Sequence, residues 1–272
     1  MRKRLAIGFL VAVLVVVAAI PAAASANAAA LRAALDTSEI RQGTIGIRID
    51  QGTTRLVRAT IARGEEKYTY AIDAKEKSTV WLPLQLGNGN YEVSLFENVT
   101  GNKYRVALAQ KVRVHVAKAQ DVYLNSVQLI DWREADKAAE KAKKLTREAK
   151  TDEQKAKAIY DYIVGNVQYD KKLAASVTSD YVPDIDGTLE SGKAICYGYA
   201  TLYAAMLRSV GIPAKLAMGS TKLVDEYHAW NEVYLNGKWV IVDTTVDAGL
   251  SKGDKKPSFA KKPGDYEAVK YY

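Results

Sequence analysis

Three side chains in this 272-residue sequence combine the chemistry of a nucleophile, a base and an acid: Cys196, His228 and Asp243. A thiolate can attack an amide carbonyl, an imidazole can hold and later deliver the proton, and a carboxylate can fix the tautomer and charge of the imidazole. These residue types also bind metals, but a structural zinc site usually has four ligands. We therefore expect neither a metal nor a cofactor.

The only cysteine lies at the predicted start of a helix. Gly211 and Pro213 supply the signals that end this helix. In the first turn, the positive end of the helix macrodipole favours an anion such as a thiolate. A small buried apolar residue is the alternative interpretation of Cys196. Apolar or aromatic residues recur at helical spacing along one face of this predicted helix: Tyr199, Leu202, Tyr203, Met206, Leu207 and Val210.

A predicted hairpin brings the imidazole and the carboxylate together. An Asn-Gly pair, typical of a two-residue turn, joins the predicted strands 227–235 and 238–245. This turn fixes the register, which places His228 opposite Thr245 and makes Asp243 its diagonal neighbour, roughly 7–8 Å away at Cα. A histidine satisfied within the sheet and a strand-end carboxylate are the alternative interpretations. Because side chains alternate, one face carries His228, Trp230, Asp243 and Thr245.

The first 26 residues have the pattern of a signal peptide. A basic segment, residues 2–4, precedes an uncharged apolar run, residues 5–20, and small residues at 24–26 fit a cleavage site. We therefore expect an exported protein, secreted or at the cell surface; an uncleaved membrane anchor is the alternative. A lone cysteine in an oxidising compartment cannot form an internal disulfide, which favours a reactive role.

The composition, 48% hydrophobic and 26% charged, is that of a globular protein, and the net charge is +8. The basic excess of the mature chain lies mainly in residues 41–125, with 13 Lys and Arg against 8 Asp and Glu. This excess suits an anionic cell-wall surface, although a solvated surface without a partner fits equally well. It is no nucleic-acid signature. A membrane partner is expected only if the signal stays uncleaved.

The N-terminal half has a β pattern. Residues 27–40 are predicted to be an alanine-rich linker, and residues 41–125 an antiparallel, immunoglobulin-like β-sandwich. His115 lies in a strand with no acidic or cysteine partner nearby and is interpreted as structural. Asn98-Val99-Thr100 fits either a glycosylation acceptor or a hairpin. The predicted strands are 44–49, 54–61, 67–72, 78–82, 91–96, 103–108, 111–116 and 122–124.

The pattern changes to helical near residue 131, where we place the start of a second domain, 131–272. Residues 132–150 predict a solvated helix, and Thr151 to Gln154 has the form of a capping box before an amphipathic helix. Residues 168–191 look irregular. Their acids suit solvation of a loop or a calcium site, but match no EF-hand spacing; they are Asp170, Asp180, Asp184 and Asp186.

Three segments resemble the transglutaminase-like superfamily. The first runs Gly-Lys-Ala-Ile-Cys from Gly192 to Cys196, then through Leu-Arg-Ser-Val-Gly-Ile-Pro to Ala214. The second is His-Ala-Trp-Asn-Glu-Val-Tyr from His228, and the third is Trp-Val-Ile-Val-Asp, ending at Asp243. Their order and their spacings, 32 and 15 residues, are similar to that family, and the resemblance covers about residues 135–250.

The resemblance implies an α+β protein in which a papain-like core follows the sandwich, as in secreted bacterial transglutaminase-like proteins. It assigns Cys196 as nucleophile, His228 as general base and acid, and Asp243 as the residue that orients the imidazole. The substrate would be an extracellular protein or a peptidoglycan peptide, attacked at an amide and released by hydrolysis or by transfer to an amine. The alternative is a non-catalytic cell-surface or partner-binding protein that retains the fold.

The sequence departs from the family pattern at two places. The family often has Asp-Pro-Thr where this chain has Asp243-Thr-Thr, which is expected to loosen the strand end without removing the carboxylate. Tyr197, a bulky residue, directly follows the nucleophile and is expected to narrow the acyl pocket. The backbone N–H of Cys196 is the natural first oxyanion donor. Tyr169 and Tyr181 are the candidates for a second donor.

Overall fold

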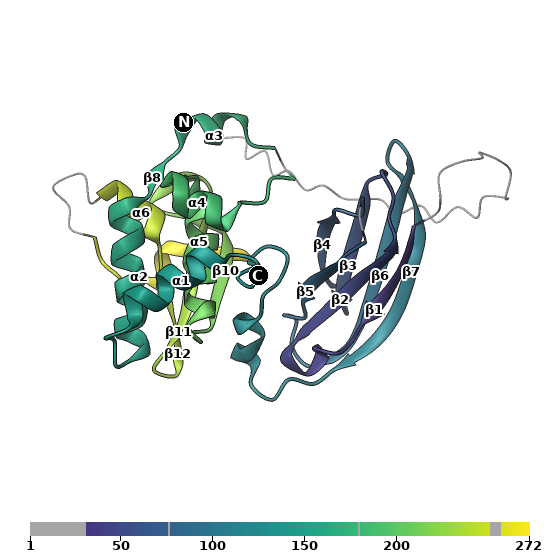
Figure 1. The fold of residues 1–272 in the computed structure, drawn as a ribbon, viewed down its shortest axis with the longest axis horizontal. Helices are drawn as coiled ribbons and strands as arrows, with labels where there is room; N and C mark the ends of the chain where they lie inside the picture. The colour runs from purple at the N-terminus through teal and green to yellow at the C-terminus, as the bar shows by residue number, and fades with distance from the viewer. Residues whose placement is uncertain (1–30, 76, 179, 251–256) are drawn as a thin grey trace, which may run out of the picture.

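The computed structural model describes residues 31–75, 77–178, 180–250 and 257–272. The signal peptide predicted for residues 1–26 lies outside them. The described chain is an α+β protein with a β-rich N-terminal half and a mixed helix and strand C-terminal half (Figure 1). Among the helices of the described part, none has the length and apolar character needed to cross a membrane.

Two antiparallel sheets make up the N-terminal half, in the strand orders β1-β2-β5 and β4-β3-β6-β7. Inward-facing residues of both sheets, such as Ile47 of the first and Leu95 of the second, are fully buried in one apolar core. The two sheets are seen on the right of Figure 1. The strands are β1 (Arg32–Asp36), β2 (Thr44–Gln51), β3 (Val57–Arg63), β4 (Glu66–Ile72), β5 (Thr79–Pro83), β6 (Gly89–Thr100) and β7 (Lys103–Val114).

Three details of this half differ from the sequence-based expectation. The predicted linker 27–40 contains strand β1, because its backbone pairs with β2 although alanine is a weak strand former. The predicted strands 103–108 and 111–116 are a single strand, β7, which ends at Val114, since no turn residue separates them. The predicted strand 122–124 belongs instead to a 3₁₀ helix, η2 (Ala119–Leu124). The apolar run 122–124 has only three residues, which is too short for its periodicity to distinguish a strand from a helix.

The Asn98-Val99-Thr100 triplet lies at the end of β6, next to the turn of the hairpin between β6 and β7. The side-chain amide of Asn98 donates to the carbonyls of Gly101 and Lys103, 2.7 and 3.3 Å away, and so closes the turn. His115, just past the end of β7, lies on the surface with Nδ1 3.5 Å from the amide of Asn88. The hairpin explanation of the triplet is therefore sufficient.

The C-terminal half packs helices on a four-stranded sheet of order β12-β11-β10-β13. Helix α5 lies at its centre, in contact with α1, α2, β10 and β11, as Figure 1 shows on the left. The helices are α1 (Asp136–Thr146), α2 (Asp152–Asn166), α3 (Lys171–Ser176), α4 (Ile185–Ser191), α5 (Cys196–Ser209) and α6 (Thr244–Leu250). The strands are β8 (Gln168–Tyr169), β9 (Lys193–Ala194), β10 (Ala214–Thr221), β11 (Val224–Leu235), β12 (Lys238–Val242) and β13 (Tyr266–Tyr271).

The predicted helix over 132–150 is shorter than expected, and α1 spans only its middle. The N-terminus of α2 forms as predicted, with Thr151 Oγ1 accepting a hydrogen bond from the N–H of Gln154 at 3.2 Å. The reciprocal bond differs from a standard capping box, because the side chain of Gln154 accepts from the N–H of Lys150 rather than from that of Thr151.

One buried arginine fixes the end of α5. Arg208 is 3% exposed, and its guanidinium donates to the carbonyls of Asn125, Ala214 and Tyr272 at 2.7 to 3.0 Å. These carbonyls lie just after η2, at the start of β10 and just after β13. Burial lowers the pKa of this guanidinium. Arg208 therefore ties the helix that begins at Cys196 to three distant segments.

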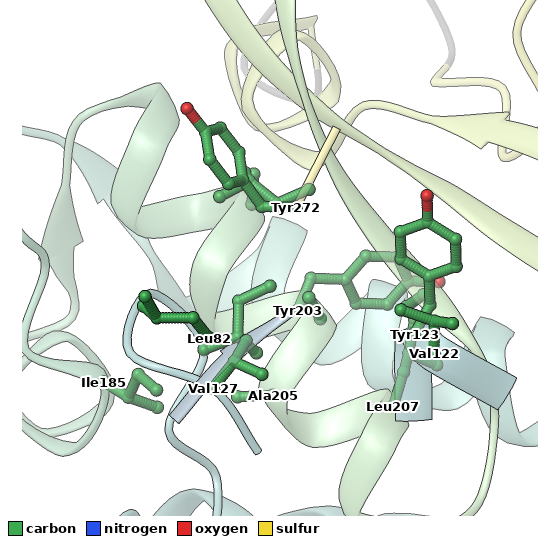
Figure 2. Close-up of a cluster of buried hydrophobic side chains, with 14 of the residues drawn as sticks. Leu82, Val122, Tyr123, Val127, Ile185, Tyr203, Ala205, Leu207 and Tyr272 are labelled. Atoms are coloured by element: carbon green, nitrogen blue, oxygen red, sulfur yellow. The ribbon is translucent and has the colours of Figure 1, made fainter. Parts of the chain in front are cut away.

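A shared apolar cluster joins the two halves (Figure 2). Leu82 of β5 comes from the N-terminal half, Val127 from the connection, Tyr203 from α5 and Tyr272 from the segment after β13. The ring of Tyr272 also packs edge-on against Tyr68, with centroids 5.4 Å apart. The last strand of the sheet is therefore anchored on the β-rich half.

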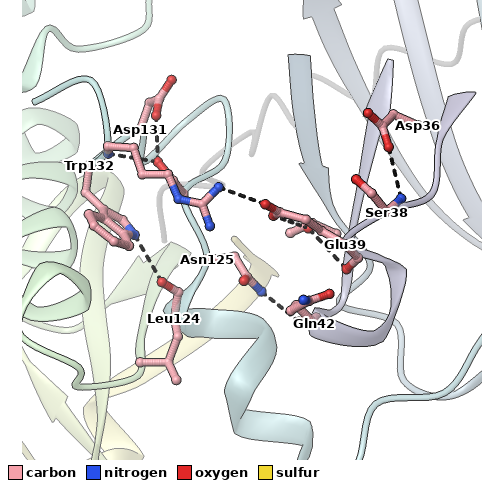
Figure 3. A network of polar contacts seen from close by, with 11 residues as sticks. Asp36, Ser38, Glu39, Gln42, Leu124, Asn125, Asp131 and Trp132 are labelled. Atoms are coloured by element: carbon pink, nitrogen blue, oxygen red, sulfur yellow. Dashed lines mark hydrogen bonds and ion pairs between the residues drawn. The ribbon is translucent and has the colours of Figure 1, made fainter. Parts of the chain in front are cut away.

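Polar contacts reinforce this joint (Figure 3). The side-chain amide of Asn125 donates to the carbonyl of Gln42 at 2.7 Å. Arg133 and Glu39 form an ion pair at 2.9 Å across the same boundary. This pair is partly exposed and contributes little stability, whereas the half-buried amide bond fixes how the connection leaves η2.

Candidate active site

Cys196 is the first residue of α5, and its side chain is partly exposed. The chain enters this helix through β9, which runs parallel to β8 and pairs Ala194 with Tyr169. Gly192, with φ of 60°, ends α4 and turns the chain into β9. The N–H groups of the first helical turn have no acceptor within the helix, so they point toward the region of the thiol. The predicted position of the cysteine is confirmed.

The hairpin has the register expected from its turn. Asn236 and Gly237 both have positive φ, 51° and 79°. The pairing of β11 with β12 begins at Leu235 with Lys238 and continues to Asn231 with Val242. His228 and Asp243 meet as predicted, with Nε2 of the imidazole 2.9 Å from Oδ2 of the carboxylate. Both are buried, His228 at 4% exposed and Asp243 at 0%.

The expectation that His228 lies opposite Thr245 is wrong, because β12 ends at Val242. Asp243 turns the chain into α6, and its Oδ1 accepts the N–H groups of Thr245 and Val246 at 3.1 and 3.0 Å. This is the hydrogen-bond pattern by which an aspartate begins a helix, and it competes with continuing the strand. The carboxylate is thus held by the first turn of α6 rather than by a sheet.

The imidazole contacts both other side chains. Burial alone lowers the pKa of His228, but hydrogen bonds to Asp243 and Cys196, together with the charges of both, outweigh it and raise that pKa to about 9. Because Asp243 occupies Nε2, the nitrogen left for the thiol is Nδ1. At neutral pH the imidazole is therefore protonated between a carboxylate and a sulfur. This ordering of nucleophile, imidazole and acid suits acyl transfer.

The carboxylate of Asp243 has a further partner that the sequence did not indicate. The hydroxyl of Tyr266, at the start of β13, donates to Oδ2 at 2.9 Å, the same oxygen that faces His228. Burial and the charge of Asp243 raise the pKa of the Tyr266 phenol, which therefore stays a donor. The tyrosines at both ends of segment 266–271 are typical of a strand. No local sequence pattern, however, predicts that Tyr266 contacts Asp243.

The two aromatic candidates for oxyanion stabilisation lie in different surroundings. Burial raises the pKa of Tyr169, and the charge of Cys196 raises it further, so this phenol lies within electrostatic reach of the sulfur. The ring of Tyr181 packs against Tyr197 instead, with centroids 6.1 Å apart. Of the two phenols, only Tyr169 is affected by the charge of Cys196, so Tyr169 stays the candidate for a second oxyanion donor, in addition to the backbone N–H of Cys196.

Two bulky residues next to the proposed catalytic groups have packing roles. The ring of Tyr197 packs against that of Tyr181, and Tyr197 is not among the residues that line the cavity bordered by β8 and α6. Trp230 stacks on His228, with centroids 6.3 Å apart and planes 21° apart, and contacts the Tyr266 ring at 5.0 Å. The indole thereby covers one side of the buried imidazole.

The four acids between residues 168 and 191 hold the local structure. Asp170 and Asp184 accept backbone N–H groups at the starts of α3 and α4, and Asp186 accepts those of Lys137 and Ala138 at the start of α1. Asp180 pairs with an arginine of β3 at 3.1 Å. In the described ranges, no group of three or more His, Cys, Asp or Glu side chains could hold a metal ion. Helix capping, rather than loop solvation, explains most of these acids.

Comparison with known proteins places the same segment in a family. The sequence model of the family described as the transglutaminase-like superfamily matches residues 139–244. The human kyphoscoliosis peptidase is 34% identical over 116 residues, and the mouse protein 33%. Each match covers 39% of this chain and 17% of the relative, so this chain spans about a sixth of the curated relatives it matches.

Solved structures with partial similarity include a protein from Cytophaga hutchinsonii, named as a candidate cysteine protease, and the transglutaminase of red sea bream. The first has a TM-score of 0.41 at 16% identity, covering 75% of this chain and 74% of its own. The second has a TM-score of 0.33 at 10% identity, covering 74% and 47%. The family match over residues 139–244, which includes Cys196, His228 and Asp243, shows that this part of the chain belongs to the transglutaminase-like superfamily.

Proposed function

We propose that the protein is a cysteine enzyme that breaks amide bonds of extracellular proteins or cell-wall peptides through a thioester on Cys196. One observation carries the proposal: a partly exposed thiol at a helix start contacts an imidazole whose other nitrogen is bonded to a buried carboxylate. The family match supports it, because the superfamily resemblance assigns these positions to a catalytic triad.

The reaction begins from a thiolate on Cys196 beside a protonated His228. The sulfur attacks the carbonyl carbon, a C–S bond forms, and the negative charge moves to the carbonyl oxygen, where the N–H of Cys196 and the hydroxyl of Tyr169 would stabilise it. The C–N bond then breaks, and the leaving amine takes the proton from Nδ1 of His228. This leaves a thioester and a neutral imidazole.

The second half of the reaction restores the enzyme. Water or a primary amine attacks the thioester while His228 accepts the proton of the attacking group. The C–S bond breaks, which regenerates the thiolate beside the imidazolium. Water produces hydrolysis and an amine produces acyl transfer, so access of water to the thioester decides between the two outcomes. Asp243 keeps Nδ1 directed at the sulfur through both steps.

The activity is tested by incubating the full mature chain with casein and a fluorescent primary amine. Covalent incorporation of the amine identifies acyl transfer, whereas new peptide termini found by mass spectrometry identify hydrolysis. We expect one of the two signals in the wild type and neither in Cys196→Ala. The Cys196→Ser variant is a matched control for folding, because it keeps the size of the side chain.

Alkylation of Cys196 separates the enzyme from the alternative, a non-catalytic binding protein that retains the fold. The imidazole of His228 contacts the thiol and can take its proton, so iodoacetamide should alkylate Cys196 faster than a thiol that has no neighbouring base. The His228→Gln variant should lose this advantage. Two results together would favour the binding protein: an alkylation rate that is slow and rises with pH only as for an ordinary free thiol, and no product from casein.

We also propose that the protein works outside the cell. The support is the signal-like sequence of residues 1–26 and the single cysteine. An anionic cell-wall surface is the proposed site of attachment through the basic excess of residues 41–125. Fractionation of cells that express the full chain, with detection of the processed N-terminus in the medium or wall fraction, tests this. A full-length chain retained inside the cell contradicts it.

A further inference from the structure

A cavity of about 300 Å³ is lined by residues from the same segments that carry the proposed catalytic residues. We name it the β8–α6 pocket, after two of the elements that border it. Its walls come from β8, from α5, from the turn between β10 and β11, and from α6. The lining residues used below are Tyr169, Tyr199, Leu223, Val224, Val246 and Gly249.

Each proposed catalytic residue is linked to a wall of this pocket. Tyr199 lies one helical turn after Cys196 on α5, and Tyr169 lies within electrostatic reach of the same sulfur. The N–H of Val246 is bonded to the carboxylate of Asp243. Val224 begins the strand that carries His228. The walls of the pocket are therefore chain neighbours or hydrogen-bond partners of all three proposed catalytic residues.

The chemistry of the walls selects apolar groups. Among the lining residues described, none carries a charged side chain. The hydroxyl of Tyr199 is already used, since it donates to the carbonyl of Val167 at 2.6 Å. Leu223 and Tyr169 form the rim and are 47% and 46% exposed, so apolar surface faces water at the entrance. Covering such surface is favourable for an apolar side chain and unfavourable for a charged one.

We propose that the β8–α6 pocket is a specificity subsite that receives one aromatic or branched aliphatic side chain of the substrate, from a residue flanking the amide that Cys196 attacks. This inference rests on the proposed function and names the class of peptide it acts on. The volume is at the lower limit of ordinary ligand sites, which suits a single side chain rather than a larger group.

Gly249 offers a way to fill the pocket without disturbing its walls. A Cβ atom built at this glycine would have none of the described atoms within 4 Å, and the residue lies near the end of α6 with no positive φ. Gly249→Phe should therefore place a ring in the space meant for the substrate. Gly165, near the end of α2, likewise has none of the described atoms within 4 Å of a built Cβ, and it is not among the residues that line the pocket. Gly165→Phe is the matched control.

The test uses a synthetic peptide library randomised at two positions on each side of a central Gln, incubated with the full mature enzyme and a primary-amine probe. Mass spectrometry records both cleavage and amine incorporation. We expect Leu, Ile, Phe or Tyr to be preferred over Gly at one flanking position by about tenfold or more. Gly249→Phe should reduce this preference about tenfold, and Gly165→Phe should keep it.

A second variant guards against misfolding of the first. Gly249→Ala adds one methyl group to a helix and should shift the preference from Phe toward Val. Alkylation of Cys196 by iodoacetamide, which needs no side-chain subsite, should be equal in all three variants and the wild type. Uniform use of flanking residues by an active wild type, or an unchanged preference in both Gly249 variants, would overturn the subsite alone. A wild type that neither turns over peptides nor reacts with iodoacetamide would overturn the proposed function and the subsite with it.

Discussion

Tyr266 donates its hydroxyl hydrogen to Oδ2 of Asp243, the oxygen that also faces the imidazole of His228. The phenol comes from β13, which pairs with β10, whereas the carboxylate follows β12 at the opposite edge of the same sheet. The aspartate is therefore positioned from both edges of the sheet and by the first turn of α6. We assign Tyr266 as a positioning residue.

Replacing Tyr266 with phenylalanine should affect the imidazole more than the fold. The ring can keep its contact with Trp230. We therefore expect a loss of about 1.5–3 kcal/mol in the free energy of unfolding, the usual contribution of a hydrogen bond to a charged group. The carboxylate would no longer share its charge with the phenol, so the pKa of His228 should rise further. Nuclear magnetic resonance titration of the imidazole measures this. An unchanged pKa with the same stability loss would make the role of Tyr266 purely structural.

The raised pKa of His228 also predicts how stability depends on pH. The folded-state value of about 9 lies above the ordinary 6.5, so the protonated imidazole stabilises the fold below pH 6.5, and this contribution is lost as the pH rises through 9. The shift corresponds to roughly 3 kcal/mol. Urea unfolding of wild type and His228→Gln should show a difference that is largest at pH 6 and smallest near pH 10. A difference that grows with pH would contradict the assignment.

Tyr169 is expected to act on the reaction rate rather than on binding. Tyr169→Phe keeps the ring that borders the β8–α6 pocket and removes only the proposed oxyanion donor. Loss of one such donor typically lowers kcat about 10²- to 10³-fold. Steady-state kinetics with a single peptide substrate should show this fall with little change in KM. Tyr181→Phe, whose ring packs on Tyr197, is the matched control and should keep wild-type kcat.

Gly219 allows β13 to approach β10 closely. It pairs with His228 on one side and Ala268 on the other, and a Cβ atom there would lie 2.0 Å from the carbonyl oxygen of Glu267. Gly219→Ala should push β13 away and cost about 1–3 kcal/mol of unfolding free energy, with loss of the contact made by Tyr266. Gly165→Ala, with open space around it, should be neutral or slightly stabilising in the same urea experiment.

Asp186 should behave as a helix cap and not as a calcium ligand. Its two oxygens accept the N–H groups of Lys137 and Ala138, so Asp186→Ala should destabilise the protein by about 0.5–2 kcal/mol. Thermal unfolding of the wild type should be the same with calcium as with a chelator. A rise in melting temperature with calcium that disappears in Asp186→Ala would contradict the capping role.

The sequence was sufficient for contacts that local rules determine. The Asn236-Gly237 turn set the register of its hairpin, and that register brought His228 to Asp243. The helix start at Cys196 and the cap at Thr151 also follow from short patterns. The assignment of catalytic roles to these residues stays a prediction, as do the division into domains at residues 125–131 and the immunoglobulin-like kind of sandwich.

Contacts between distant segments could not be predicted in this way. Tyr266 reaches Asp243 only because β13 pairs with β10. The paired residues of these strands that lie nearest in sequence, Thr221 and Tyr266, are still 45 residues apart, and no turn rule predicts pairing over that distance. Strand β1 was missed because its pairing with β2 outweighs the weak strand preference of alanine. The end of β12 was predicted too late in the sequence. The alternation of side chains alone favours a longer strand, but Asp243 caps α6 and so begins a helix there.

The position of β13 in the chain has a consequence for biosynthesis. A ribosome makes this strand after every other described element, yet its phenol completes the set of donors around the carboxylate. A nascent chain that has already folded α5 and the hairpin still leaves the acid without its tyrosine. In the emerging protein the proposed catalytic centre therefore remains incomplete until the last strand of the sheet has been made.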